Sequence, residues 1–344
     1  MAGFEEILGH DSIKRHLQRA VETGMVSHAY ILNGEDGMGK KSLACAFALA
    51  LLCENRKAEG CMECHACRQV LSGNHPDLIF VTHEKPNSIG VDDVREQIND
   101  TIRIMPYSSS YKIYIIDESE KMTVQAQNAL LKTIEEPPSY GVLILLTTSQ
   151  EAFLPTILSR CIKLKLKPLR DEMVKNYLME KLQTEENDAG MYTAFAQGNL
   201  GRAISIAASE DFRIMLQSVL DLLKRIGQMD ISELLDYIRR IKEDKLDAEE
   251  CLDLMQLWYR DVLIYKATQD KELLIFKGEC KAVEDISSRC AYDGLERILD
   301  TITRTRMRLN SNVNMELAME FLLLSMKENY GGRNMSQVNV KEGE

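Results

Sequence analysis

The sequence predicts an α/β domain of the phosphate-loop type, built on a parallel sheet, followed by an all-helical part. A glycine-rich turn follows a buried apolar run near the start of the chain, in residues 28–42 (HAYILNGEDGMGKKS). Short apolar runs then alternate with helical patterns, which is typical of parallel strands joined by helices. After Pro168 the apolar residues recur with helical spacing as far as Glu328.

The composition is that of an ordinary globular chain. It has 344 residues, of which 45% are hydrophobic and 28% charged, enough for two or three domains. The sequence holds no apolar run near the roughly 20 residues that span a bilayer, and the charged start of the chain lacks a signal-peptide core. We therefore expect a cytoplasmic protein with no membrane contact. The formal net charge of -11 argues against a general positive field for nucleic acid.

The first domain is expected to span residues 1–167. It should open with an amphipathic helix over residues 4–24, built on Ile13, Leu17 and Val21, and continue with a helix over 43–53 that is apolar on almost all sides. Further helices are expected at 91–105 and 123–135. The predicted strands are residues 30–32, 78–82, 112–116, 142–147 and 162–166.

The rest of the chain is expected to form two helical domains and a tail. A small domain covers 168–210, and its sequence GNLGRAISIA predicts a turn into a helix. A larger all-α domain covers 211–330, and the tail at 331–344 is polar and expected to be disordered. Two apolar stripes in the larger domain are read as core packing, with partner-helix binding as the alternative: Leu252, Met255, Trp258, Tyr259 and Val262, and Ile298, Ile302 and Met307.

The glycine-rich turn matches the phosphate-binding pattern G-x-x-x-x-G-K-[ST] at all but its last position. Backbone N–H groups and a lysine would hold the phosphates of ATP or ADP there, through Gly34, Gly37, Gly39 and Lys40. The hydroxyl that ligates Mg²⁺ is replaced by Lys41, and Ser42 comes one residue late, about 100° further around the helix. The alternative for this fragment alone is a surface turn.

A second predicted site element is the strand KIYIIDE, which ends in two carboxylates. In phosphate-loop enzymes the aspartate at this place, here Asp117, holds Mg²⁺ and the next glutamate, Glu118, orients the attacking water. Thr147 and Thr148 close another central strand and would place a hydroxyl between these elements. The alternative is two solvated acids at a strand end.

Four of the nine cysteines have the spacing C-x7-C-x2-C-x2-C: Cys53, Cys61, Cys64 and Cys67. Two-residue gaps let neighbouring sulfurs point at one centre, and Zn²⁺ takes four thiolates in a closed tetrahedral site. The spacing therefore predicts a structural zinc site within residues 53–67. His65 and His75 are alternative ligands nearby.

Two segments resemble the clamp-loader branch of the AAA+ ATPases, namely NALLKTIEEPPSYGVLILLTTS (128–149) and LPTILSRC (154–161). The order of loop, zinc cluster, acidic strand and Ser-Arg-Cys is similar to that of bacterial DNA polymerase III clamp-loader subunits. The resemblance implies that the small domain is a lid and the larger one a collar that joins subunits. The length and the altered loop resemble the delta-prime branch of the family more than the tau/gamma ATPases.

The resemblance also implies roles for particular residues. Ser159, Arg160 and Cys161 match the motif whose arginine reaches the γ-phosphate of ATP on the neighbouring subunit. In GNLGRA, the sensor-arginine position of hydrolysing relatives is Gly201, and Arg202 comes one residue later. With two catalytic elements displaced, Asp117 and Glu118 are read as vestigial acids and Thr148 as sensor-like.

The expected function is therefore that of a scaffold subunit that donates Arg160. The implied partners are the tau/gamma and delta subunits, the sliding clamp, and primer-template DNA in the assembled complex. One alternative is a tau/gamma-like ATPase that hydrolyses ATP itself, with Ser42 or water completing the magnesium shell. A third interpretation, a zinc-dependent DNA-binding module, is disfavoured by the charge.

Overall fold

The computed structural model describes residues 3–55, 57–243, 246–311 and 313–330, so the predicted disordered tail at 331–344 lies outside the described residues. The chain divides into two compact units. One comprises Met1–Val174 with Gln197–Arg202, and the other Lys175–Ala196 with Ala203–Glu344. Within the described ranges, no helix combines the length and apolar character needed to cross a membrane. The predicted fold class is confirmed, and the three domain boundaries stay a prediction.

The first unit is built on a five-stranded parallel sheet with the strand order β2-β3-β4-β1-β5. All five predicted strands form. Because parallel strands all end at one edge of the sheet, the turns after β1 and β3 lie at the same edge, with β4 between the two strands. The strands are β1 (Ala29–Asn33), β2 (Leu78–Val81), β3 (Lys112–Ile116), β4 (Gly141–Thr147) and β5 (Ile162–Lys165).

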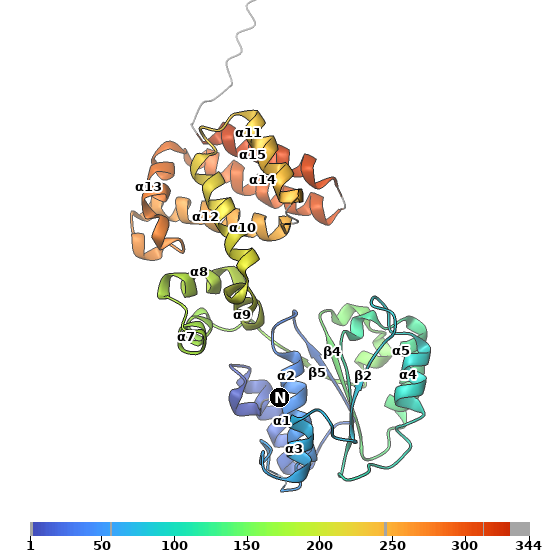
Figure 1. Ribbon diagram of the computed structural model, residues 1–344. Helices are drawn as coiled ribbons and strands as arrows, with labels where there is room; N and C mark the ends of the chain where they lie inside the picture. Colours follow the sequence, from blue (N-terminus) through green and yellow to red (C-terminus); the bar gives the residue numbers. More distant parts are fainter. Residues whose placement is uncertain (1–2, 56, 244–245, 312, 331–344) are drawn as a thin grey trace, which may run out of the picture. The chain divides into compact units, whose positions relative to one another are not determined.

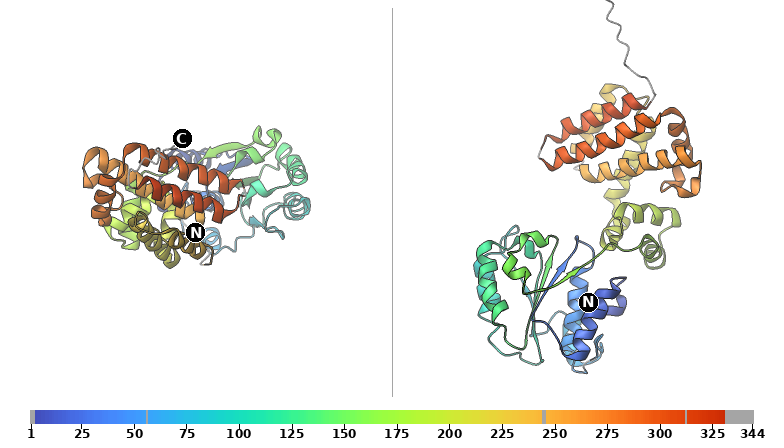
Figure 2. Two further views of the ribbon diagram at one scale, coloured as in Figure 1. Left: turned by 90° about the horizontal axis from the view of Figure 1, so that it is seen from above. Right: turned by 180° about the vertical axis from the view of Figure 1, so that it is seen from behind.

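Helices cover both faces of the sheet (Figures 1 and 2). Successive strand side chains point to opposite faces, so Tyr30 and Leu32 enter one core while Ala29 and Ile31 enter the other. The first face is covered by α1 (Asp11–Thr23), α2 (Lys40–Leu52) and α3 (His65–Leu71). The second is covered by α4 (Val91–Val94), η2 (Arg95–Asn99), α5 (Val124–Glu135) and α6 (Pro155–Leu158).

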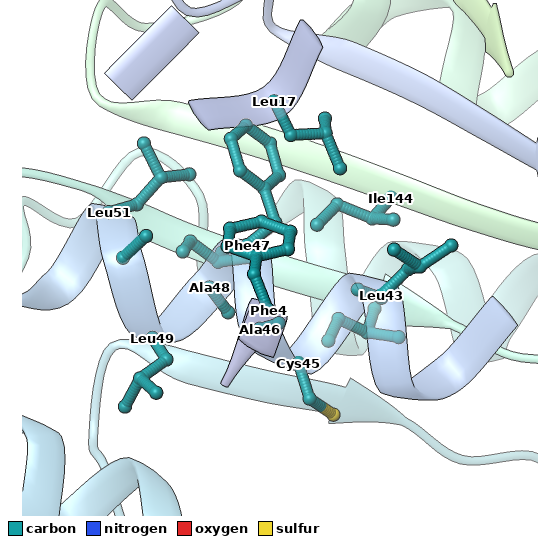
Figure 3. Packing of buried hydrophobic residues seen from close by; sticks show 14 of the residues in the cluster. Phe4, Leu17, Leu43, Cys45, Ala46, Phe47, Ala48, Leu49, Leu51 and Ile144 are labelled. Carbon is teal, nitrogen blue, oxygen red and sulfur yellow. The ribbon is translucent and has the colours of Figure 1, made fainter. Parts of the chain in front are cut away.

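Helix α2 is buried on almost all sides, as its sequence predicts. Four alanines at alternate positions, residues 44 to 50, leave room for close packing, and the Phe47 ring meets Tyr30 edge-on at 5.1 Å between centroids. Figure 3 shows Phe4, Leu17 and Ile144 gathered around this helix. Burial of one such aromatic side chain contributes about 2 to 3 kcal/mol. The helix is thereby fixed in place, and with it the glycine-rich turn from which it starts.

Two helix predictions in this unit are wrong. The segment predicted as one helix over 4–24 is a short turn, η1 (Phe4–Glu6), followed by α1. Gly9 and His10 have φ values of 67° and 53°, and this left-handed backbone cannot continue a right-handed helix.

The helix predicted over 91–105 ends at Asn99. The buried Asp77 carboxylate accepts hydrogen bonds from the backbone N–H groups of Tyr107, Ser108 and Ser109, at 2.6, 3.0 and 3.1 Å. Lys112 Nζ donates to Thr101 O at 2.7 Å. These bonds fix residues 101–109 as a loop, so the helix does not continue through them.

The second unit is helical, and its last two helices, α14 (Tyr292–Asn310) and α15 (Met315–Asn329), lie side by side (Figures 1 and 2). The predicted stripe on α12 (Ala248–Thr268) is confirmed as core, because all five residues are buried. The stripe on α14 is wrong at Met307, which is 58% exposed, while Thr305 is buried in its place. Met307 lies five residues after Ile302 and so turns away from the helix face that Ile298 and Ile302 share.

The remaining elements follow in chain order. Short turns are η3 (Ser119–Lys121), η4 (Gln150–Ala152), η5 (Lys271–Leu273) and η6 (Lys277–Glu279). The helices after the sheet are α7 (Asp171–Leu182), α8 (Glu186–Ala196), α9 (Leu200–Ala208), α10 (Glu210–Arg225), α11 (Ile231–Glu243), α12 (Ala248–Thr268), α13 (Cys280–Arg289), α14 (Tyr292–Asn310) and α15 (Met315–Asn329).

Candidate functional site

The glycine-rich turn joins the end of β1 to the start of α2. Its first glycine is tied to the sheet, because the Gly34 N–H donates to Thr147 O at 3.1 Å. Gly37 and Gly39 have φ values of 84° and 92°, which favour glycine over residues with a side chain. Lys40 is the first residue of α2. The turn thus places a lysine and a helix N-terminus at the sheet edge where the strands end.

The Lys40 ammonium is satisfied by the turn itself. Its Nζ donates to Gly34 O at 2.7 Å and to Glu35 O at 3.1 Å, and it pairs with Asp36 Oδ1 at 3.0 Å. The residue is only 7% exposed. An ammonium has three N–H donors, so all three are used within the turn.

The segment 199–202 closes against this turn by backbone contact. Asn199 Nδ2 donates to Asp36 O at 2.6 Å, and the Gly201 N–H donates to Gly37 O at 3.0 Å. A Cβ atom added at Gly201 would lie 2.5 Å from the Gly37 Cα, so no side chain fits at this position without movement. Glycine at the sensor-arginine position therefore serves close packing, and the Arg202 N–H bonds Asn199 Oδ1 at 3.1 Å.

The predicted loop residues other than Gly34 share one cavity of about 290 Å³ with Asp117. Its lining consists of Asp36, Gly37, Gly39, Lys40, Lys41, Ser42 and Asp117. Lys41 Nζ lies 3.4 Å from Asp117 Oδ2, with the two side chains 64% and 44% exposed. The residue that stands in place of the expected hydroxyl thus forms an ion pair with the acid expected to hold the metal.

Glu118 is bound to a neighbouring lysine. Lys121 Nζ lies 2.7 Å from Glu118 Oε1, and His83 Nε2 lies 3.4 Å from Oε2. The hydrogen bond from Lys121, with a smaller contribution from His83, lowers the pKa of the Glu118 carboxyl. Its backbone is left-handed, with φ of 48°. The Glu118 side chain is therefore a carboxylate that is already in contact with Lys121 and His83.

Thr147, the last residue of β4, and Thr148, which follows it, do not bridge the loop and the acidic strand through their hydroxyls. Thr148 Oγ1 donates to Glu120 Oε1 at 2.9 Å, and the buried Thr147 Oγ1 donates to Ser149 O at 2.9 Å. The sensor-like residue Thr148 therefore contacts Glu120 rather than Asp117.

Arg160 lies just before β5, at the edge of the sheet where the strands begin. The glycine-rich turn lies at the other edge, where the strands end. Its Nη2 is 3.1 Å from Glu135 Oε1, and its Nη1 donates to Thr156 O at 3.0 Å and Ser159 Oγ at 3.2 Å. The side chain is 40% exposed. The next residue, Cys161, is buried, and burial raises the pKa of its thiol to about 12. Cys161 therefore acts as an inert core residue that anchors the motif.

The four predicted cysteines come together. The sulfur atoms of Cys53, Cys61, Cys64 and Cys67 all lie within 4.8 Å of one another. The Cys64 N–H donates to Cys61 Sγ at 3.3 Å, and this bond is the largest of several that lower the pKa of Cys61 to about 6, whereas burial raises the pKa of the Cys67 thiol. This donor set fits a metal ion, and the group can hold one.

The two histidines considered as alternatives lie outside that group in the described part of the chain. His75 is buried, and both of its ring nitrogens are engaged: Nδ1 accepts from the Asp77 N–H at 3.1 Å and Nε2 bonds Ser109 Oγ at 3.1 Å. It therefore supports the loop held by Asp77.

Sequence reasoning missed the role of Asn199 and the pairing of Lys41. An asparagine before a predicted helix is a common N-cap, and that signal was present in GNLGRA. The partner of Asn199 lies 163 residues earlier, in the turn, and no local pattern points to it. The Lys41–Asp117 pair likewise depends on how the sheet is ordered.

Comparison with known proteins identifies the family to which this chain is similar. A family model described as "DNA polymerase III, delta subunit" matches residues 9–170, and one described as "DNA polymerase III, delta subunit, C terminal" matches residues 207–328. Together the two models cover most of the chain.

Individual relatives carry names from the same group. The chain is similar to DNA polymerase III subunit tau of Bacillus subtilis (29% identity, 89% of this chain) and spans only 58% of that protein's length. It is similar to subunit delta' of the same organism (28% identity), covering 92% of this chain and 95% of that one. A structure of a DNA polymerase III gamma subunit-related protein from Thermotoga maritima aligns with a TM-score of 0.44 at 22% identity, over 92% of this chain and 99% of that one. On the two family models and the end-to-end match to a delta' subunit, this chain belongs to the DNA polymerase III clamp-loader subunit family.

Proposed function

We propose that this chain is a delta-prime-like clamp-loader subunit that donates Arg160 in trans to ATP held by a neighbouring subunit. Its partners would be the tau/gamma ATPase and delta subunits in a hetero-oligomeric ring in the cytoplasm. The ring would act on the sliding clamp and primer-template DNA. The all-α domain at 211–330 would serve as the collar in this ring, and the small domain at 168–210 as the lid.

The observation that carries this proposal is the placement of Arg160 relative to the chain's own phosphate loop. In the sheet, Ile162 of β5 pairs with Tyr30 of β1, and the strands are parallel. Arg160 lies in the turn before Ile162, whereas the loop begins at Gly34, four residues beyond Tyr30. Four residues of strand correspond to about 13 Å. An arginine side chain cannot span that distance, so an ATP site that Arg160 served would have to lie on another subunit.

The chemistry of Arg160 suits such a role. A planar guanidinium makes paired hydrogen bonds to phosphate oxygens, and an arginine supplied in trans raises phosphoryl-transfer rates by about 10³ to 10⁵. Its present partner, the Glu135 carboxylate, is 48% exposed. An exposed pair of this kind contributes about 0 to 1 kcal/mol, so a γ-phosphate can replace Glu135 at little cost.

The zinc and nucleotide assignments complete the proposal. Four cysteine sulfurs suit Zn²⁺ in a closed structural site, which has no open position for water. The loop would bind ATP or ADP weakly and without efficient turnover, because Lys40 is engaged by its own turn and segment 199–202 packs on that turn.

The experiment compares the ATPase rate of assembled complexes that contain the wild-type chain or Arg160→Ala. We expect hydrolysis at the ATP site facing this subunit to fall about 10³-fold, with assembly unchanged. Arg160→Lys should recover little, because it keeps the charge but loses the fork geometry. Arg103→Ala removes another exposed arginine of the same unit and is the matched control. Undiminished hydrolysis in the Arg160→Ala complex would refute the role.

The second candidate function is that of an ATPase in its own right. It is favoured by one observation, namely that Lys40, Ser42 and Asp117 line the same cavity. Steady-state ATP turnover by the isolated chain, abolished by Lys40→Ala, would support it. Absence of turnover in the isolated wild-type chain would reject it.

A further inference from the structure

The donor set around Asp117 does not fit Mg²⁺. A magnesium ion requires six oxygen ligands at about 2.1 Å in a near-octahedral shell. In a phosphate loop the hydroxyl after the lysine and the strand-end aspartate supply or orient part of that shell. Here the residue after Lys40 is Lys41, which carries no oxygen and has no lone pair to offer.

Lys41 also brings a positive charge to the place where the metal charge would act. Its Nζ lies 3.4 Å from Asp117 Oδ2 and 5.8 Å from the centre of the Phe80 ring. Asp117 lines the 290 Å³ cavity together with Gly37 and Gly39 of the loop. A divalent cation that approached Asp117 would meet the ammonium at short range, and the repulsion would offset the attraction of the carboxylate.

Two groups of the described structure orient the Lys41 ammonium toward Asp117. The carboxylate attracts it by charge, and the Phe80 ring offers its negative face. Lys40 cannot take over the same role, because its three donors bind Gly34, Glu35 and Asp36. The two adjacent lysines therefore do different things: Lys40 closes the loop, and Lys41 neutralises the acid across the cavity.

We propose that Lys41 is the residue that excludes Mg²⁺ from this site, with its ammonium taking the place of the ion beside Asp117. Nucleotide bound here is then bound without a metal. This inference rests on the proposed function, in which the loop does not hydrolyse ATP. Its test measures binding to the isolated chain, so its failure would leave the role of Arg160 open, and failure of the Arg160 experiment would leave Lys41 open.

The test is calorimetric titration of ADP into the purified full-length chain, with EDTA or with excess Mg²⁺. We expect no tightening by Mg²⁺ in the wild type, whether its affinity is weak or undetectable. Lys41→Thr restores the hydroxyl and removes the charge, so it should gain a tightening of about tenfold or more with Mg²⁺. Lys41→Arg keeps the charge and should behave as the wild type.

Two further variants separate the charge from the missing hydroxyl and assign the partner. Lys41→Met removes the ammonium without adding an oxygen, and it should gain a smaller magnesium dependence than Lys41→Thr. Adding Asp117→Asn to Lys41→Thr should abolish the gain. Because Lys41 is 64% exposed, none of its variants should change the melting temperature appreciably.

Three outcomes would overturn the inference. The first is magnesium-dependent tightening in the wild type. The second is a Lys41→Thr variant that binds ADP no more tightly with Mg²⁺ than without it, or that does not bind ADP at all. The third is a gain that persists when Asp117→Asn is added.

Discussion

The two edges of the central sheet differ in how their charged groups are satisfied. At the edge where the strands end, Lys40 is buried and uses all its donors within its own turn, and Lys41 neutralises Asp117. At the edge where the strands begin, Arg160 is 40% exposed and pairs with an exposed glutamate. The first edge is closed by internal bonds, whereas the second offers a guanidinium that can exchange its partner.

The difference shows how a phosphate-loop fold can change its role without changing its architecture. Internal polar contacts replace those that a nucleotide and metal would make, so the loop and segment 199–202 stabilise each other. The proposed role of Arg160 in trans needs only an arginine on a firm base, which the buried Cys161 and the short helix α6 provide. In this proposal the loop edge contributes stability and the opposite edge donates the arginine.

The largest effect on the stability of the first unit should come from the cysteine cluster, because Cys53 caps the far end of α2, the helix that starts at the loop. Cys64→Ala should abolish metal binding and lower the free energy of unfolding by several kcal/mol, since structural zinc contributes on the order of 10 kcal/mol in small domains. Chelation should produce the same loss in the wild type. Cys280→Ala removes a cysteine far from the cluster in sequence and should be nearly neutral. Unchanged zinc content in Cys64→Ala would contradict the site.

A smaller effect is expected where segment 199–202 meets the loop. Gly201→Ala places a Cβ atom 2.5 Å from the Gly37 Cα, and relieving this overlap should cost about 1 to 3 kcal/mol. Gly190→Ala, also within a helix, adds a Cβ with no atom within 4 Å and should stabilise by up to about 1 kcal/mol. Thermal unfolding measures both. Equal melting temperatures for the two variants would show that the contact does not close the loop.

The smallest effect concerns the acid dependence of Glu118. Its folded pKa is lowered by Lys121, so its contribution to stability is present above about pH 4.3 and is lost as pH falls through the lowered value. Because Glu118 is 46% exposed, the contribution should be well under about 1 kcal/mol. Lys121→Met should raise the pKa of Glu118 in a carboxyl NMR titration, and Lys132→Met should not. An unchanged pKa in Lys121→Met would show that Glu118 is not engaged.

The five strands and two of the four helices with predicted bounds could be predicted from sequence because each depends on local apolar patterns. Four of the five strands are largely buried runs and β5 is mostly exposed, and α5 spans Val124–Glu135 within the predicted 123–135, with Thr123 as its N-cap. The prediction over 91–105 was wrong because Asp77, distant in sequence, captures the backbone of residues 107–109. Such a competing hydrogen-bond partner leaves no periodic signal.

Most residues of the candidate site could be predicted from the sequence, but the contacts between them could not. The spacing of cysteines within residues 53–67 is local, and the sulfurs do meet. The mismatch at Lys41 was visible, yet its partner is set by the sheet order, in which β4 separates β1 from β3. That Arg160 and the loop lie at opposite edges also follows from strand register alone.

One paired experiment tests whether Arg160, rather than the phosphate loop, carries the proposed function. Complexes assembled with Arg160→Ala or with Lys40→Met are compared for ATP hydrolysis during clamp loading, with subunit assembly checked for each. We predict that Arg160→Ala lowers hydrolysis about 10³-fold at the site it faces, while Lys40→Met changes it by less than about twofold. Full hydrolysis with Arg160→Ala, or an equal loss with Lys40→Met, would contradict the account.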